Sequence, residues 1–85
     1  MSAARTRLPD SIGLLLRREL EEAIEQANLG ELDTAVAKRY LIDKAPLMDI
    51  AVEHGYDRSA IGKRLTPILA RVESTAKRLF PENTS

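Results

Sequence analysis

The sequence predicts an all-α fold, a bundle of four to five helices that contains a helix-turn-helix. Glycine and proline are sparse, with four of each among 85 residues, and β-branched residues never alternate over a window of strand length. Ala, Leu, Glu and Arg are the commonest residues, and all of them favour helices. A chain this short forms one domain, so we expect residues 1–85 to be a single helical unit with disordered ends at about 1–7 and 81–85.

The first helix is expected to begin at Asp10 or Ser11, because either side chain can cap a helix N-terminus. Gly30 tolerates the left-handed conformation that closes helices, so the helix should end shortly before it. Between these limits apolar residues recur at steps of three and four, namely Ile12, Leu16, Leu20, Ala23, Ile24 and Ala27. This spacing predicts one amphipathic helix whose apolar stripe is buried.

A second helix is predicted over about 31–43. Its apolar stripe consists of Leu32, Ala35, Val36, Tyr40 and Leu41. Pro46 should end this helix, because proline disfavours helical geometry at the residue before it, here Ala45.

Two further helices are predicted on either side of Gly55. The first, over about 47–54, should stop at this glycine, and the second should follow Asp57, whose carboxylate can accept from the amides of the first turn. The apolar stripe of the second helix comprises Ile61, Leu65, Ile68, Val72, Ala76 and Leu79. Pro67 lies within this stripe, lacks a backbone N–H and follows Thr66, which can cap a new helix. We therefore expect a kink or a break at Pro67.

Residues 47–66 meet the steric requirements of a helix-turn-helix. Ala51 occupies the point where the two helices cross, which needs a small side chain, and Gly55 permits the sharp turn. Four more core positions carry apolar residues, namely Ile50, Tyr56, Ile61 and Leu65. His54 stands where an aliphatic residue is usual, so it is either partly exposed at the helix end or a buried, hydrogen-bonded neutral imidazole.

This segment resembles the helix-turn-helix of phage Cro and repressor proteins in Gly55, in Ser59-Ala60-Ile61 and in Lys63. Over 32–80 the order of helices, with a basic last helix, is similar to region 4 of bacterial sigma factors and to small phage regulators of that type. The resemblance implies a bacterial or phage transcription regulator that binds duplex DNA, with RNA polymerase as a further partner.

The second helix of the motif supplies the candidate DNA-binding residues. With Ile61 and Leu65 directed inward, a rotation of ~100° per residue places Ser59, Gly62, Lys63 and Thr66 outward, flanked by Arg58 and Arg64. Arg58 and Lys63 have the donors to contact guanine edges, Ser59 suits a base edge or a phosphate, and Arg64 and Arg71 suit phosphates. The predicted set is Arg58, Ser59, Lys63, Arg64, Thr66 and Arg71. Gly62 has no side chain to read a base, so contacts to the DNA phosphate backbone gain importance relative to base contacts.

Charge is distributed unevenly along the chain. Thirteen basic residues balance thirteen acidic ones, so the net charge gives no indication of a nucleic-acid or membrane partner. From Arg58 to Phe80, however, six bases stand against the single acid Glu73. Such a segment is either a solvated helical face or a surface for phosphates, and its place in the motif favours the second interpretation.

Composition disfavours several classes of protein. The absence of cysteine excludes disulfides and thiolate zinc sites and favours a reducing cytoplasm. Apolar runs are no longer than the three residues 14–16, whereas a membrane span needs ~20. A single histidine and scattered carboxylates offer neither a metal site nor an acid–base pair. We expect a cytoplasmic protein that is not an enzyme, does not enter a membrane and uses no cofactor or metal.

A homodimer is expected to be the functional unit, because a small core and a single reading face both gain from a second copy. Its contact would use the stripe Ile68, Val72, Ala76 and Leu79, unless this stripe folds back on the chain's own first helix.

The competing hypothesis on function is a helical interaction module without DNA binding. In that case the first and last helices would bind RNA polymerase, a phage assembly partner or another copy of the chain.

Overall fold

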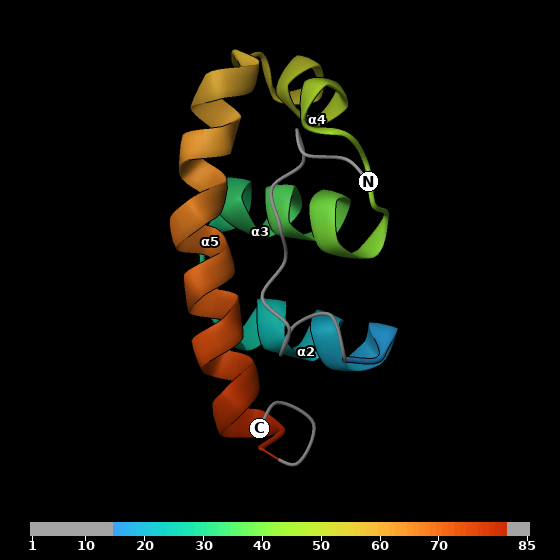
Figure 1. Cartoon of the computed structure of the whole chain (residues 1–85), viewed down its shortest axis with the longest axis vertical. Coiled ribbons are helices and arrows are strands. Elements are labelled where there is room, and N and C mark those ends of the chain that lie inside the picture. The colour runs from blue at the N-terminus through green and yellow to red at the C-terminus, as the bar shows by residue number, and fades with distance from the viewer. Residues whose placement is uncertain (1–14, 82–85) are drawn as a thin grey trace, which may run out of the picture.

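The computed structural model of the chain describes residues 15–81, and Figure 1 shows their arrangement. Within these residues four α-helices follow one another, with a π-helical segment after the second. The elements are α2 (Arg17–Gln26), α3 (Glu31–Ala37), η1 (Lys38–Ile42), α4 (Leu47–His54) and α5 (Arg58–Leu79). No strand occurs in this part of the chain, so the predicted all-α class is confirmed. The ends expected to be disordered lie outside the described residues, apart from Pro81.

The longest helix, α5, runs along one whole side of the bundle. It has 22 residues, and a helix of that length extends for ~33 Å, close to the longest dimension of the molecule, 36 Å. The three shorter helices each pack against it. Figure 1 shows α4 beside the N-terminal end of α5, α3 beside its middle and α2 beside its C-terminal end. The apolar stripe of α5 therefore contacts three different helices in turn.

The core lies between α5 and the shorter helices. Each α-helix contributes an alanine that is at most 1% exposed, namely Ala23, Ala37, Ala51 and Ala76. Small side chains at these places let the helix axes approach one another closely. Larger aliphatic residues fill the surrounding space: Ile24, Val36, Leu41, Ile50, Ile61, Leu65, Ile68 and Val72. Among the described residues, no buried side-chain nitrogen or oxygen lacks a hydrogen-bond partner.

The start of α2 differs from the prediction. The structure begins this helix at Arg17 with Leu16 as its N-cap, and the predicted caps at Asp10 and Ser11 lie outside the described residues. The cause is local, because the backbone N–H of Leu16 donates to the Glu19 carboxylate at 2.9 Å and this contact closes the first turn. Leu16 was predicted on the buried stripe but is 57% exposed, and Leu15 is buried in its place. The end of the helix before Gly30 is confirmed.

The predicted helix over 31–43 is present as α3 followed directly by η1. Its last turns are wider than those of an α-helix, since the N–H of Asp43 reaches the carbonyl of Lys38 at 3.1 Å, five residues back. The N–H of Ala45 then bonds the carbonyl of Arg39 at 2.9 Å, so the chain leaves the helix just before Pro46, as expected.

Of the two alternatives expected at Pro67, a kink or a break, the break is wrong, because α5 is one continuous helix through this residue. Proline removes one helical hydrogen bond, here to the carbonyl of Lys63, at a cost of ~3 kcal/mol. The stripe residues nearest to Pro67, Leu65 before it and Ile68 after it, are both buried. Burial of the continuous stripe offsets the lost bond, because ending the helix at Thr66 would expose part of that stripe.

The apolar stripe at the C-terminal end of α5 is covered within the single chain. Ile68, Val72 and Ala76 are at most 2% exposed, and Leu79 is half-buried. This part of α5 packs against α2, which supplies Ala23 to the same core. The expectation that the stripe forms a subunit contact is therefore wrong, and the alternative, in which it folds back on the first helix, describes the structure. A homodimer would have to use another surface.

Candidate nucleic-acid interface

The α4–α5 pair, defined here as residues 47–66, is joined by a connection of three residues. Gly55 ends α4 with φ 73°, a left-handed conformation that a side chain would strain. The N–H of Gly55 bonds the carbonyl of Val52 at 3.3 Å, and the N–H of Tyr56 bonds that of Ala51 at 2.9 Å. These bonds occupy the carbonyls of Ala51 and Val52 near the end of α4, and the chain turns after this helix, as the glycine predicted.

The contact between the two helices is made by the residues expected to form it. Ile50, Ala51, Ile61 and Leu65 are all at most 1% exposed. Tyr56 was also predicted to be a core residue, and this prediction is wrong, because its side chain is 43% exposed. The left-handed turn at Gly55 carries Tyr56 past the end of α4, into the extended connection and outside the contact. His54 is half-buried at the C-terminal end of α4, which matches the first of the two alternatives for this residue.

The N-terminus of α5 begins where it was predicted, but its cap differs. Asp57 is the N-cap residue, with its backbone carbonyl accepting from the N–H of Ile61 at 3.1 Å. Its carboxylate makes no capping hydrogen bond, contrary to expectation. The amides of the first turn of α5 are therefore available to an acceptor from outside the chain, and helix N-termini favour anionic acceptors such as phosphate.

The outward face of α5 near this N-terminus carries four of the six predicted DNA-binding residues. The reading face, as we name it, consists of Arg58, Ser59, Lys63 and Thr66, all of which are exposed. Within residues 15–81 neither Arg58 nor Lys63 makes an ion pair or a side-chain hydrogen bond. Both cations are free to meet an external ligand.

Gly62 lies at the edge of the reading face. A Cβ atom built at this residue meets no atom within 4 Å, so nothing inside the chain requires a glycine here. Glycine in a helix is less stable than alanine by ~0.5–1 kcal/mol. The space beside Gly62, between Arg58 and Lys63, is therefore open.

The other two predicted residues have partners inside the protein. Arg64 donates through Nε to Oδ1 of Asp33 on α3, at 2.8 Å. Arg71 donates through Nη2 to the carbonyl of Ala27, the C-cap residue of α2, at 3.0 Å. Arg71 also lies 13 residues beyond Arg58, or ~20 Å along the helix. The structure therefore does not bring Arg71 together with the reading face and gives it a role in holding α2 against α5.

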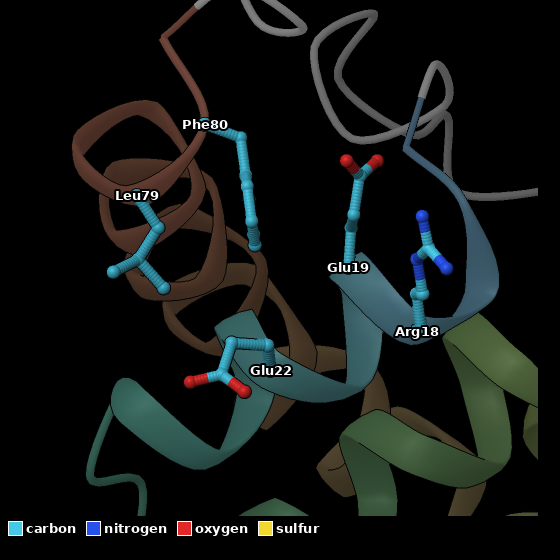
Figure 2. A pocket seen from close by; sticks show the side chains of 5 residues that line it. All are labelled: Arg18, Glu19, Glu22, Leu79 and Phe80. Carbon is cyan, nitrogen blue, oxygen red and sulfur yellow. The ribbon is translucent and has the colours of Figure 1, made fainter.

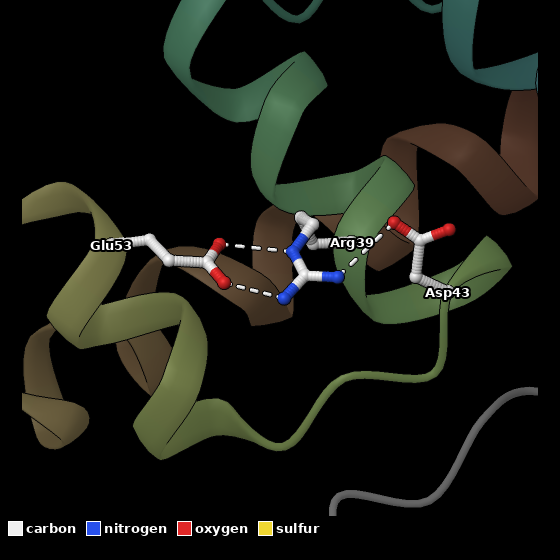
Figure 3. A network of polar contacts seen from close by, with 3 residues as sticks. All are labelled: Arg39, Asp43 and Glu53. Carbon is white, nitrogen blue, oxygen red and sulfur yellow. Dashed lines mark hydrogen bonds and ion pairs between the residues drawn. The ribbon is translucent and has the colours of Figure 1, made fainter.

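A polar cluster that the sequence analysis missed fixes the other side of the α4–α5 pair (Figure 3). Arg39 on η1 donates through Nε to Oε1 of Glu53 at 2.9 Å and through Nη2 to Oε2 of the same carboxylate. Its Nη1 also contacts Oδ2 of Asp43 at 3.2 Å. Hydrogen bonding to Arg39 holds the pKa of Glu53 below its ordinary value. This two-pronged contact sets the position of α4 relative to η1.

A shallow, open depression of about 510 Å³ lies at the far end of the molecule, between the start of α2 and the end of α5 (Figure 2). Its lining consists of Arg18, Glu19, Glu22, Leu79 and Phe80. Figure 2 shows the carboxylates of Glu19 and Glu22 pointing in different directions, without the convergence that acid–base chemistry needs. Among the described residues no cluster of His, Cys, Asp or Glu could hold a metal ion. The depression defines no chemistry, so the reading face is the stronger candidate.

Comparison of the chain with protein-family models, with curated proteins and with solved structures finds no match. No helix in the described part of the chain is long and apolar enough to cross a membrane.

Proposed function

We propose that the chain binds duplex DNA through the α4–α5 pair, with the first turns of α5 in the major groove. The observation that carries this proposal is the reading face, where Arg58 and Lys63, which have no ion pair among residues 15–81, lie on the N-terminal turns of a packed helix. An α-helix fits the major groove, and long cationic side chains at its N-terminal end can reach guanine O6 and N7. The open amides of the first turn suit a backbone phosphate.

Each residue of the reading face has a role in this proposal. Arg58 and Lys63 contact base edges, while the hydroxyls of Ser59 and Thr66 contact a base edge or a phosphate. Gly62 contributes no side chain, so the number of base contacts from one chain is small. Binding should then be semi-specific, with phosphates supplying most of the affinity.

The two predicted cations outside the reading face have partners inside the protein. Arg64 could reach a phosphate only by leaving Asp33, and Arg71 is engaged at the end of α2. We therefore withdraw Arg71 from the proposed interface and assign Arg64 at most a minor share of the affinity.

The biological setting follows from the resemblance to Cro-type and sigma region 4-like proteins. In this proposal the protein is a cytoplasmic transcription regulator of a bacterium or phage. It acts either beside RNA polymerase or as a pair of chains on inverted half-sites roughly 34 Å apart. A pair would double the few base contacts that one reading face offers.

Charge reversal at two lysines of α5 tests the proposal. Lys63→Glu should abolish detectable binding of a fluorescein-labelled duplex in anisotropy measurements at low salt, because it places a carboxylate in the groove. Lys77→Glu is the matched control, since Lys77 is exposed on the same helix, 14 residues or ~21 Å farther along. It should bind like the wild type.

Two results would contradict the proposal. If the wild type binds no duplex even at low salt, the helical interaction module is the better account. If the two substitutions have equal effects, the reading face is not the contact surface.

A further inference from the structure

The outer face of α4 carries a line of large apolar side chains that the fold does not cover. Met48 is 55% exposed, Val52 is 73% exposed, and Tyr56, just beyond the helix, is 43% exposed. Met48 and Val52 are four residues apart and so lie one above the other on the helix, and Tyr56 is exposed just beyond the end of α4. We name these three residues the apolar strip. An exposed cluster of this kind in a small protein indicates an interaction surface.

Acidic residues border the apolar strip. Asp49 and Glu53 are exposed on α4 beside Met48 and Val52, and Asp57 follows Tyr56 in the chain. Among the described residues, the carboxylates of Asp49 and Asp57 make no ion pair. Glu53 is engaged by Arg39. Helix α4 itself contains no lysine or arginine, so the border is negative along its length.

This charge pattern decides which partner fits. Helix α4 offers no lysine or arginine to phosphates of nucleic acid or to anionic lipid headgroups, and Asp49 would repel them. A symmetric dimer through α4 would set the acidic border of one copy against that of the other, which is unfavourable for the same reason. A protein segment with cations around an apolar centre has the complementary arrangement.

We propose that the apolar strip docks a basic amphipathic helix of a partner protein. The partner's apolar residues pack on Val52 with Met48 and Tyr56 at either side, and its lysines or arginines meet Asp49 and Asp57. Helix α4 presents a fixed surface for this contact, because Ile50 and Ala51 are buried beneath it and Arg39 clamps Glu53. A fixed surface loses little conformational freedom on binding. The docking surface adjoins the reading face at Asp57, the N-cap of α5, but Val52 lies on α4 outside the reading face, so the two proposals can be tested separately.

Two synthetic peptides test the proposal with the full chain. The probe is an 18-residue helical peptide of leucine and lysine with leucine at steps of three and four, and its twin replaces every lysine by glutamate. We expect fluorescence anisotropy to show the lysine peptide binding at least roughly tenfold more tightly than its twin, because complementary charges border the strip. Amide shifts in ¹⁵N-labelled protein should be largest over residues 48–57.

Substitution of Val52 separates docking from simple charge attraction. Val52→Asp adds a negative charge, so attraction alone would tighten binding of the lysine peptide. Docking predicts the opposite, a loss of roughly tenfold, because burial of one valine side chain corresponds to about that factor. Ser74→Asp adds the same charge at an exposed position of α5 and should leave the affinity within about twofold of the wild type.

Several outcomes would overturn the proposal. Equal affinity for both peptides, unchanged or tighter binding by Val52→Asp, or amide shifts centred outside 48–57 would each exclude it. Self-association of the wild type that Val52→Asp abolishes in sedimentation would identify a second copy as the occupant, against the proposal. Duplex DNA binding by Val52→Asp should equal that of the wild type, so failure of docking can be distinguished from failure of the proposed function.

Discussion

Arg58 and Lys63 near the N-terminal end of α5 are of the same types as Arg71 and Lys77 farther along, but the two pairs differ in their partners. Near the N-terminal end Arg58 and Lys63 have no partner within the described residues, whereas farther along Arg71 bonds the carbonyl of Ala27 and Lys77 pairs with Glu73 at 3.7 Å. Arg71 has its partner because α2 packs against this part of α5, whereas Glu73, the partner of Lys77, lies one turn away on α5 itself. Net charge along a helix thus shows where cations are, but only the packing shows which are available to a ligand.

The largest expected effect tests whether the C-terminal end of α5 is core. Val72→Asp should unfold the chain, because this residue is fully buried and a carboxylate there has no partner. The cost, on the order of 4 kcal/mol, is comparable to the whole stability of a domain of 85 residues. Circular dichroism would show the loss of helix. A folded Val72→Asp monomer derived from a dimeric wild type would instead place the stripe in a subunit interface.

A pair of arginine substitutions tests the difference between the two ends directly. Arg71→Ala should lower the free energy of unfolding by about 1 kcal/mol, through the lost bond to Ala27, and leave the salt dependence of DNA binding unchanged. Arg58→Ala should leave stability within about 0.5 kcal/mol and weaken duplex binding by about 1–3 kcal/mol. Urea unfolding and anisotropy over a salt series measure the two quantities. The comparison fails if Arg71→Ala reduces the salt slope by about one unit, as a phosphate contact would.

Two glycines in the α4–α5 pair should respond in opposite directions to alanine. Gly62→Ala should raise stability by about 0.5–1 kcal/mol, since the added methyl group meets no neighbour. Gly55→Ala should lower it by about 1–2 kcal/mol, because φ 73° is unfavourable for a residue with a Cβ. Thermal melts of both variants provide the check, and a stabilised Gly55→Ala would mean that the turn is not left-handed.

The smallest expected effect concerns the cluster on the other side of the pair. The pKa of Glu53 is lowered in the folded state by its hydrogen bonds to Arg39, so the stabilisation is present at neutral pH. The stabilisation from the Glu53–Arg39 contact begins to be lost when the pH falls below about 4.5, the ordinary pKa of a glutamate. The loss is complete once the pH has passed below the lowered pKa of Glu53. Glu53→Gln should therefore lose a little stability at pH 7 and show a flatter decline between pH 5 and 3 than the wild type. Identical profiles of stability against pH for the two proteins would mean that the Glu53 carboxylate does not stabilise the fold.

Local sequence signals predicted most of the fold. Pro46 and Gly55 set the bounds of α4, and the three- and four-residue spacing identified the buried face of α5. The failures of prediction had both long-range and local causes. Packing on both sides of Pro67 keeps α5 continuous. The bond between Leu16 and Glu19 is a local contact over three residues, and with it α2 begins at Arg17 instead of near Asp10.

The candidate site was predicted less completely than the fold. Helical periodicity placed Ser59, Lys63 and Thr66 on the outward face, and the structure has them there. The same periodicity could not show that Arg64 and Arg71 are engaged, because their partners lie 31 and 44 residues away in the chain. The pairing of Arg39 with Glu53, 14 residues apart, was missed for the same reason.

One NMR titration tests the central claim, that the two ends of α5 differ in their availability to DNA. A ¹⁵N-labelled sample of the full chain is titrated with a short duplex at low salt, and amide shifts are followed along the whole of α5. The account predicts that shifts are concentrated over residues 57–66 and absent over 70–79. Shifts concentrated over 70–79, or no shifts at saturating duplex, would contradict it.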